Sequence, residues 1–254
     1  MIAYLLLAAA GFLAWTVSTI AGGGGAMLLV PLVGFIAGAQ AVAPVVTLAT
    51  LIAGGGRALV FRKEIDWAVV AWALPGALIG AFLGAALFVA APADWLRVAV
   101  GLFLVSTVLQ YRFGRKRQTF RAPKWWFLPA EIIVGFLSGL IGAIGPVMNA
   151  LYLNAGITKA RMVGTKTAIS MPMHFVKIGT YTALGAMSGE LWLFGLAAGI
   201  GALSSNWLAR RLLQDMKESR FRAIVIGFMV LSGLLMLWDA RGTIVSLFSG
   251  LVAR

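Results

Sequence analysis

The chain has 254 residues, of which 61% are hydrophobic and 11% are charged, and its mean hydropathy is +0.96. Soluble domains are about half apolar and about a quarter charged, so this composition excludes a soluble enzyme and a disordered chain. Lys and Arg number 21 against 8 Asp and Glu, an excess that in a membrane protein marks cytoplasmic loops rather than a nucleic-acid partner. The sequence therefore predicts an all-α polytopic membrane protein that does not bind nucleic acid.

Ten apolar segments follow one another along the chain. Because a bilayer span needs about 20 helical residues, the fold is predicted as about eight full spans plus half-helices, or as ten segments. Segments 26–39 and 146–156 are short and follow glycine-rich breaks, so they are predicted as re-entrant half-helices or as tilted spans. The segments lie near 3–20, 26–39, 42–61, 67–90, 95–111, 126–144, 146–156, 163–186, 190–209 and 221–238.

The two glycine-rich breaks are predicted to form an anion site. Irregular backbone at mid-membrane depth is tolerated where it is buried in protein or lines a cavity, and glycine allows a ligand to approach closely. The half-helices that follow begin at Ala26 and Pro146, and their N-termini offer free N–H groups and a positive dipole end. The alternative is that the glycines only let helices pack closely. The predicted substrate-binding residues of the breaks are Gly22, Gly23, Gly24, Gly25, Gly142, Ala143, Ile144 and Gly145.

Three cations, Arg57, Lys166 and Lys177, lie within the predicted spans, whereas Glu131 is the one acid clearly within a span. A charge surrounded by lipid is costly, so such residues usually face a cavity or a partner. For Arg57 and Lys166, the alternative is that the side chains extend towards the cytoplasmic face. The excess of cations over acids favours an anionic substrate, and all three cations are assigned to its site.

Polar side chains near these cations are predicted to donate hydrogen bonds to an oxyanion, the alternative being bonds between helices or to backbone. Most of them lie beside two predicted helix interruptions, at Gly54–Gly56 and at Pro172, whereas Asn149 lies one turn into the second short half-helix. His174 and Glu131 are the predicted proton-coupling residues, although a lone histidine is more often a packing residue. The polar residues assigned to the substrate site are Thr47, Thr50, Asn149, Thr167, Ser170 and His174.

No cofactor or metal is predicted. The chain contains no cysteine, which excludes disulfides, thiol chemistry and Fe–S clusters, and its single histidine argues against a zinc site. The spans also lack a Ser/His/Asp set and paired carboxylates, which disfavours an intramembrane enzyme.

The basic loops predict the orientation of the chain. Most Lys and Arg residues fall in four blocks, at 62–63, 112–124, 159–161 and 210–222, and counting crossings puts all four on one face. That face is predicted to be cytoplasmic, so both termini are predicted periplasmic and the 112–124 loop cytoplasmic. The loops at 90–95 and 186–190 carry no Lys or Arg and are predicted outside.

The two halves of the sequence match at an offset of about 120 residues, which predicts an inverted-topology repeat. Ser18 matches Ser138, and Gly22 matches Gly142. Each repeat is predicted to hold a glycine-broken helix pair plus three spans. The predicted units are a first membrane repeat at 1–112, a basic cytoplasmic linker at 113–124, a second membrane repeat at 125–240 and a C-terminal tail or interfacial helix at 241–254.

A row of small residues, Gly76, Gly80 and Gly84, recurs every fourth position. Such a row is typical of a helix-packing face. It serves contacts within one chain or between two, so a homodimer is left open at this stage.

The stretch from Ser18 to Pro31, with its four consecutive glycines, resembles the TauE/SafE family of sulfite and organosulfonate exporters. The second glycine motif at Gly142–Gly145, the chain length, the number of spans and the basic central loop extend the resemblance over essentially the whole chain. It implies a multi-pass carrier of the bacterial inner membrane for small anions such as sulfite, sulfoacetate or related sulfonates and carboxylates. The second motif departs from a full glycine run, which leaves the substrate open.

The sequence thus predicts a secondary transporter that exports a small sulfur-containing anion by alternating access. Two alternatives stay open: an anion channel, and an uptake permease coupled to H⁺ or Na⁺. The expected partners are the small anion and the lipid bilayer.

Overall fold

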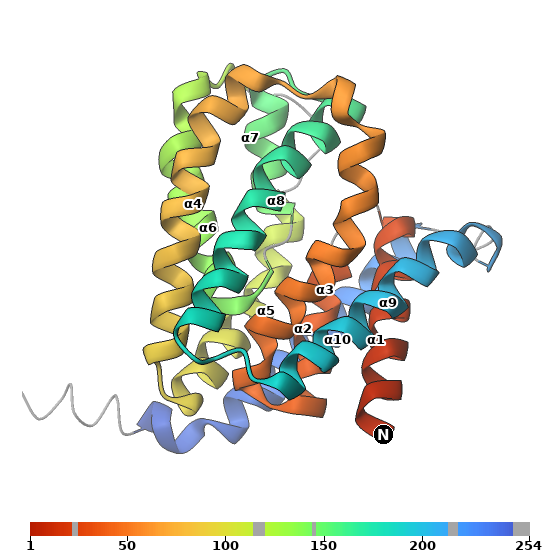
Figure 1. Cartoon of the computed structure of the whole chain (residues 1–254), viewed down its shortest axis with the longest axis vertical. Coiled ribbons are helices and arrows are strands. Elements are labelled where there is room, and N and C mark those ends of the chain that lie inside the picture. Colours follow the sequence, from red (N-terminus) through yellow and green to blue (C-terminus); the bar gives the residue numbers. More distant parts are fainter. Residues whose placement is uncertain (22–24, 114–119, 144–145, 213–217, 246–254) are drawn as a thin grey trace, which may run out of the picture.

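The computed structural model describes residues 1–21, 25–113, 120–143, 146–212 and 218–245, and within these residues it is helical and contains no strand (Figure 1). The predicted all-helical fold is therefore confirmed. The elements of the first half are α1 (Ile2–Ala21), α2 (Gly25–Ala37), α3 (Ala39–Val60), the 3₁₀ turn η1 (Arg62–Glu64), α4 (Trp67–Ala90) and α5 (Ala93–Phe113).

The second half also consists of helices, and its first elements are shorter. Each of the ten predicted segments corresponds to a helix, except that 146–156 is a 3₁₀ turn followed by a very short α-helix. The elements are η2 (Lys124–Trp126), α6 (Phe127–Ile141), η3 (Pro146–Met148), α7 (Asn149–Asn154), α8 (Lys159–Ala183), α9 (Gly189–Leu212) and α10 (Glu218–Asp239).

The two predicted helix interruptions are wrong. α3 remains helical through Gly54–Gly56, and α8 remains helical through Pro172. Glycine costs only about 1 kcal/mol relative to alanine in a helix, and a proline removes one hydrogen bond, so tertiary packing overrides both. Here α3 and α8 pack against each other, and α3 also packs against α9.

The closest packing joins a helix of the first half to a helix of the second. α4 packs on α6, α1 on α9, and α5 on α10. Small residues make these contacts so close that backbones meet: a Cβ atom added at Gly80 or Gly84 would overlap a carbonyl oxygen of α6, and one at Gly11 would overlap a carbonyl oxygen of α9. The glycine row of α4 is therefore used for packing within the chain.

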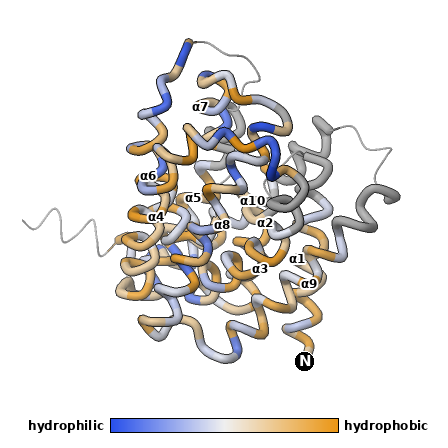
Figure 2. The backbone as a smooth tube through the Cα atoms, turned by 45° about the horizontal axis from the view of Figure 1, so that its top comes forward, coloured by the Kyte–Doolittle hydropathy of each residue, from blue (hydrophilic) through white to orange (hydrophobic). Residues whose placement is uncertain are grey.

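The residues of α4 are distributed in the reverse of the pattern seen in a soluble protein. Its buried face is largely Gly and Ala, whereas Trp72, Ile79 and Phe82 are about half exposed. A surface of large apolar side chains over a core of small ones is typical of helices that face lipid. Figure 2 shows that most of the described helices are apolar along much of their length.

Two helical stretches among the described residues are long and apolar enough to cross a membrane, namely Trp67–Ala90 and Lys124–Ile141. Shorter apolar helices accompany them, at Ile2–Thr16, Ala26–Ala37, Ala39–Gly55 and Met229–Asp239.

Charged side chains gather at the two ends of the helix bundle. One end, at the top of Figure 1, contains η1, α7 and the beginning of α8; we call it the basic end because of the exposed Arg62, Lys63, Arg121, Lys124 and Arg161. At the opposite end, Arg97 lies 2.8 Å from Asp94 and 3.9 Å from Asp239. The basic end thus carries described members of three of the four predicted basic blocks, and the side chains of the fourth, at 210–222, lie outside the described part of the chain.

Candidate functional site

The segment from α6 to α7 is a hairpin that begins and ends at the basic end. The N–H of Ala122 donates to the carbonyl oxygen of Asn154 over 2.9 Å, and the N–H of Phe120 donates to Oδ1 of Asn154 over 3.2 Å. These bonds fasten the chain before α6 to the end of α7. This is the geometry of the re-entrant alternative for the second glycine-rich break.

α6 ends at Gly142, which has φ = +94° and therefore stands in a conformation that favours glycine. A Cβ atom there would also lie 2.9 Å from Cα of Ala43 in α3. The break is thus pressed against α3, and Ala143 is buried beside it. Ile144 and Gly145, also assigned to the site, lie outside the described residues.

Lys177 of α8 is fully buried and donates to the last turn of α6. Its Nζ lies 2.9 Å from Oγ of Ser138, 3.3 Å from the carbonyl oxygen of Ser138 and 2.9 Å from that of Gly142. The carbonyl oxygen of Ser138 also accepts from the N–H of Gly142, and both carbonyls lie at the end of α6 that is the negative end of its dipole. One turn further along α8, the hydroxyl of Tyr181 donates to the carbonyl oxygen of Gly139. Lys177 therefore places its positive charge against the broken end of α6, and no carboxylate among the described residues pairs with it.

His174 lies one turn before Lys177 and is buried. Its Nδ1 has no hydrogen-bond partner among the described residues, and the charge of Lys177 acts on it. Thr47 of α3 is also fully buried and lies beside the hydroxyl of Tyr181. α3, α6 and α8 thus bring Thr47, His174 and Lys177 together around the break, in what we call the Lys177 cluster.

A second polar group, the Lys166 cluster, lies nearer the basic end and consists of Glu131, Asn149, Tyr152 and Lys166. Nζ of Lys166 lies 2.5 Å from Oδ1 of Asn149 and 5.6 Å from the centre of the Tyr152 ring. The buried carboxyl of Glu131 interacts electrostatically with Lys166. The structure therefore joins three predicted residues from α6, α7 and α8. Tyr152 was missed, because a lone aromatic residue in an apolar segment gives no signal of a polar partner.

The hydroxyl groups of Thr50, Thr167 and Ser170 donate to carbonyl oxygens of their own helices. The distances are 2.6 Å to Val46, 2.8 Å to Val163 and 3.3 Å to Thr167, respectively. In this structure they adopt the helix-to-backbone bonding that was the alternative to substrate contact.

The structure describes the first glycine-rich break and Arg57 only in part. Gly22, Gly23 and Gly24 lie outside the described residues, and Gly25 begins α2. Arg57 lies in the last turn of α3, and its side chain falls outside the described part of the chain.

Asp66 is a buried acid that the sequence reasoning missed. It caps α4 by accepting from the N–H of Val69, and its carboxylate lies 3.3 Å from Nζ of Lys124 and 2.9 Å from Nη2 of Arg161. Its own N–H donates to Oγ1 of Thr165. The available signal was an Asp immediately before an apolar helix, which is a typical N-cap. Asp66 connects α4 to the linker and to α8.

Burial of the Asp66 carboxylate raises its pKa, but the hydrogen bond from Val69 and the charges of Lys124 and Arg161 outweigh burial. The pKa of Asp66 therefore lies below its usual value. A lowered pKa means that the ionised carboxylate stabilises the fold above the pKa of the unfolded chain, about 3.9. That stabilisation is lost as the pH falls through the folded-state value.

Replacing Asp66 with alanine is expected to lower the melting temperature in detergent at pH 7 by about 4–8 °C. This corresponds to roughly 2 kcal/mol from one helix cap and two partly exposed ion pairs. The difference from the wild type should narrow below about pH 4, where the carboxylate protonates. Glu64→Ala, which removes an exposed acid two residues earlier, is the control. Equal melting temperatures for Asp66→Ala and the wild type at pH 7 would contradict the assignment.

Of the comparisons with known proteins, the one with protein families gave a match. Neither curated proteins nor solved structures gave a significant match. The model of the sulfite exporter TauE/SafE family matches residues 7–236, which include all of α2 to α9 and both polar clusters. The chain therefore belongs to the TauE/SafE family of integral membrane transporters.

Proposed function

We propose that this protein is a secondary transporter that exports a small anion, such as sulfite, sulfoacetate or a related organosulfonate, and is not an enzyme. The observation that carries the proposal is the pair of cations, Lys166 and Lys177, held by α8 against the broken α6–α7 hairpin of a TauE/SafE chain.

The balance of charge around the hairpin favours an anion. Among the described residues, Lys177 has only uncharged oxygens as partners, and Glu131 is the acid that interacts with Lys166. One acid against two cations leaves an excess of positive charge inside the bundle. Intramembrane charges of this kind mark ion and substrate pathways. Asn149 and His174 stand next to these cations and, with Thr47 beside Tyr181, provide polar groups for an oxyanion.

The packing of the helices supports the inverted repeat that alternating access requires. If α1–α5 correspond in order to α6–α10, the pair α1 and α9 corresponds to the pair α6 and α4. These are the two most closely packed pairs of the bundle. The pairs α3 and α9, and α8 and α4, correspond in the same way and are also in contact. One repeat moving against the other would expose the two polar clusters to each side in turn.

The membrane potential favours export. In the bacterial inner membrane an interior-negative potential drives anions outward, at about 2.3 kcal/mol per charge per 100 mV. Uptake would need a coupling ion, for which Glu131 and His174 are the proton-accepting candidates.

Replacing Lys166 with glutamine is expected to lower the initial rate of anion efflux from proteoliposomes by about 10-fold or more, with sulfite and sulfoacetate as the tested anions. A hydrogen bond from a charged donor contributes about 1.5–3 kcal/mol, which corresponds to a factor of that size. Lys63→Gln, which removes an exposed cation of the basic end, should transport like the wild type.

The same vesicles separate a carrier from the alternatives. A carrier shows saturable counterflow of labelled anion, whereas a channel passes current without counterflow. Wild-type vesicles that move neither anion, or a Lys166→Gln rate equal to the wild-type rate, would refute the proposed function.

A further inference from the structure

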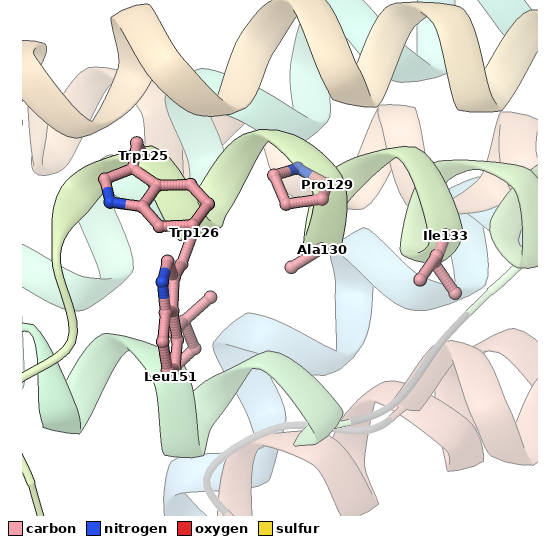
Figure 3. Close-up of a pocket in the computed structure, with 6 residues that line it drawn as sticks. All are labelled: Trp125, Trp126, Pro129, Ala130, Ile133 and Leu151. Atoms are coloured by element: carbon pink, nitrogen blue, oxygen red, sulfur yellow. The ribbon is translucent and has the colours of Figure 1, made fainter.

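An apolar groove of about 380 Å³ opens on the surface between α6 and α7 (Figure 3). Trp125 and Ile133, which line it, are 55% and 62% exposed. The residues that form this groove are Trp125, Trp126, Pro129, Ala130, Ile133 and Leu151. None of them carries a charge, so the groove offers its occupant hydrocarbon contacts.

The groove exists because the returning arm of the hairpin is short. α7 has only six residues, and Leu151 is the residue through which it contributes to the groove. The face of α6 that carries Pro129, Ala130 and Ile133 is therefore left partly uncovered. Apolar surface of this kind, in a chain of an integral membrane family, is covered by hydrocarbon.

The rim of the groove is aromatic and cationic. The rings of Trp125 and Trp126 lie 6.1 Å apart, and Phe120 lies 5.6 Å from Trp126. Both tryptophan side chains are exposed, so their indole N–H groups can reach an acceptor outside the chain. Arg121 and Lys124, both exposed, belong to the same turn of chain. Paired tryptophans and cations at a helix end are the groups that meet lipid headgroups.

We propose that this groove binds one acyl chain of an anionic phospholipid, whose phosphate lies against Arg121 and Lys124. The positive charge of the rim favours an anionic lipid over a neutral lipid or a second copy of the chain. Asp66, the buried acid that contacts Lys124, also faces Arg161, so a positive charge remains on the rim to attract an anionic headgroup. A second copy of the chain docked by a two-fold axis would place the same cations against each other. The proposal concerns the lipid-facing surface and does not rest on which anion is transported.

Native mass spectrometry and thermal unfolding in detergent test the site, with phosphatidylglycerol and phosphatidylcholine as the two probes. Phosphatidylglycerol should remain bound to the wild-type protein and raise its melting temperature more than phosphatidylcholine does. Arg121→Gln should bind phosphatidylglycerol about 5-fold more weakly, the effect of one cation near an anionic headgroup. Ala130→Phe, which fills the groove, should abolish the difference between the two lipids.

The matched control is Arg241→Gln. Arg241 lies 5.2 Å from the ring of Trp238 at the opposite end of the bundle, so it repeats the pairing of cation and tryptophan away from the groove. This variant should bind phosphatidylglycerol like the wild type. Equal stabilisation by the two lipids, unchanged binding in Arg121→Gln, or a dimer that excludes lipid from the groove would each overturn the proposal. Arg121 is exposed, so its variant remains informative even where Ala130→Phe does not fold.

Discussion

Replacing Gly80 with alanine is expected to lower the melting temperature of the protein by about 5–10 °C. The added methyl group would overlap the carbonyl oxygen of Ile132, and it would lie 2.8 Å from the backbone nitrogen of Phe136. Both are backbone atoms of α6, so a side-chain rotation cannot relieve the overlap and the two helices must separate. Overpacking of this kind costs about 1–3 kcal/mol, which for a chain of this size gives a shift of that order.

Gly179→Ala in α8 is the control for this measurement. Nothing lies within 4 Å of a Cβ atom at Gly179, so the same substitution adds a methyl group in open space. Its melting temperature in detergent should equal or slightly exceed that of the wild type, because alanine favours helix. If Gly80→Ala and Gly179→Ala have the same melting temperature, the close packing of α4 on α6 is not what stabilises the bundle.

Replacing Lys177 with methionine is expected to reduce anion transport by more than about 10-fold while shifting the melting temperature by only a few degrees. The variant loses three hydrogen bonds to the last turn of α6, and such bonds contribute about 0.6 kcal/mol each in membrane proteins. It also removes the desolvation cost of a fully buried cation, and this offsets part of the loss. Transport falls because a positive charge disappears from the hairpin.

Ser138→Ala separates the charge of Lys177 from its hydrogen bonds. It deletes one acceptor, the hydroxyl 2.9 Å from Nζ, and leaves the cation in place with both carbonyl partners. Flux measurements on proteoliposomes should give near wild-type rates for Ser138→Ala and a low rate for Lys177→Met. A Lys177→Met protein that folds and transports normally would show that the cation has no direct part in transport. A Lys177→Met protein that no longer folds would contradict the small shift in melting temperature expected here.

The helices could be predicted from the sequence, and the partners of their polar side chains could not. Hydropathy locates α4 and α8 within a few residues, and α4 is a run long and apolar enough to cross a bilayer. Gly54–Gly56 and Pro172 were misread as interruptions, because local propensity is weaker than packing on both sides of a helix. Asp66 was overlooked because its two cationic partners are distant in sequence.

In the candidate site, too, the residues could be predicted from the sequence and their partners could not. Lys166 and Lys177 were identified as intramembrane cations from the sequence alone, since a charge in an apolar run is conspicuous. That Lys177 would bind the end of α6, and that Lys166 would bind Asn149, depends on how α8 lies across the hairpin. Such a crossing is set by the glycine contacts of many helices together, and no single stretch of sequence encodes it.

The most closely packed helix pairs each join a helix of the first half to a helix of the second. This pairing has a consequence for how the chain is assembled in the cell. During synthesis α1 and α4 enter the bilayer long before their packing partners, α9 and α6, have left the ribosome. The first half must therefore wait in lipid with its glycine faces uncovered, and the tertiary structure closes only when the last helices arrive. Two separately expressed halves should accordingly reassemble into one working protein, whereas either half produced alone should be degraded.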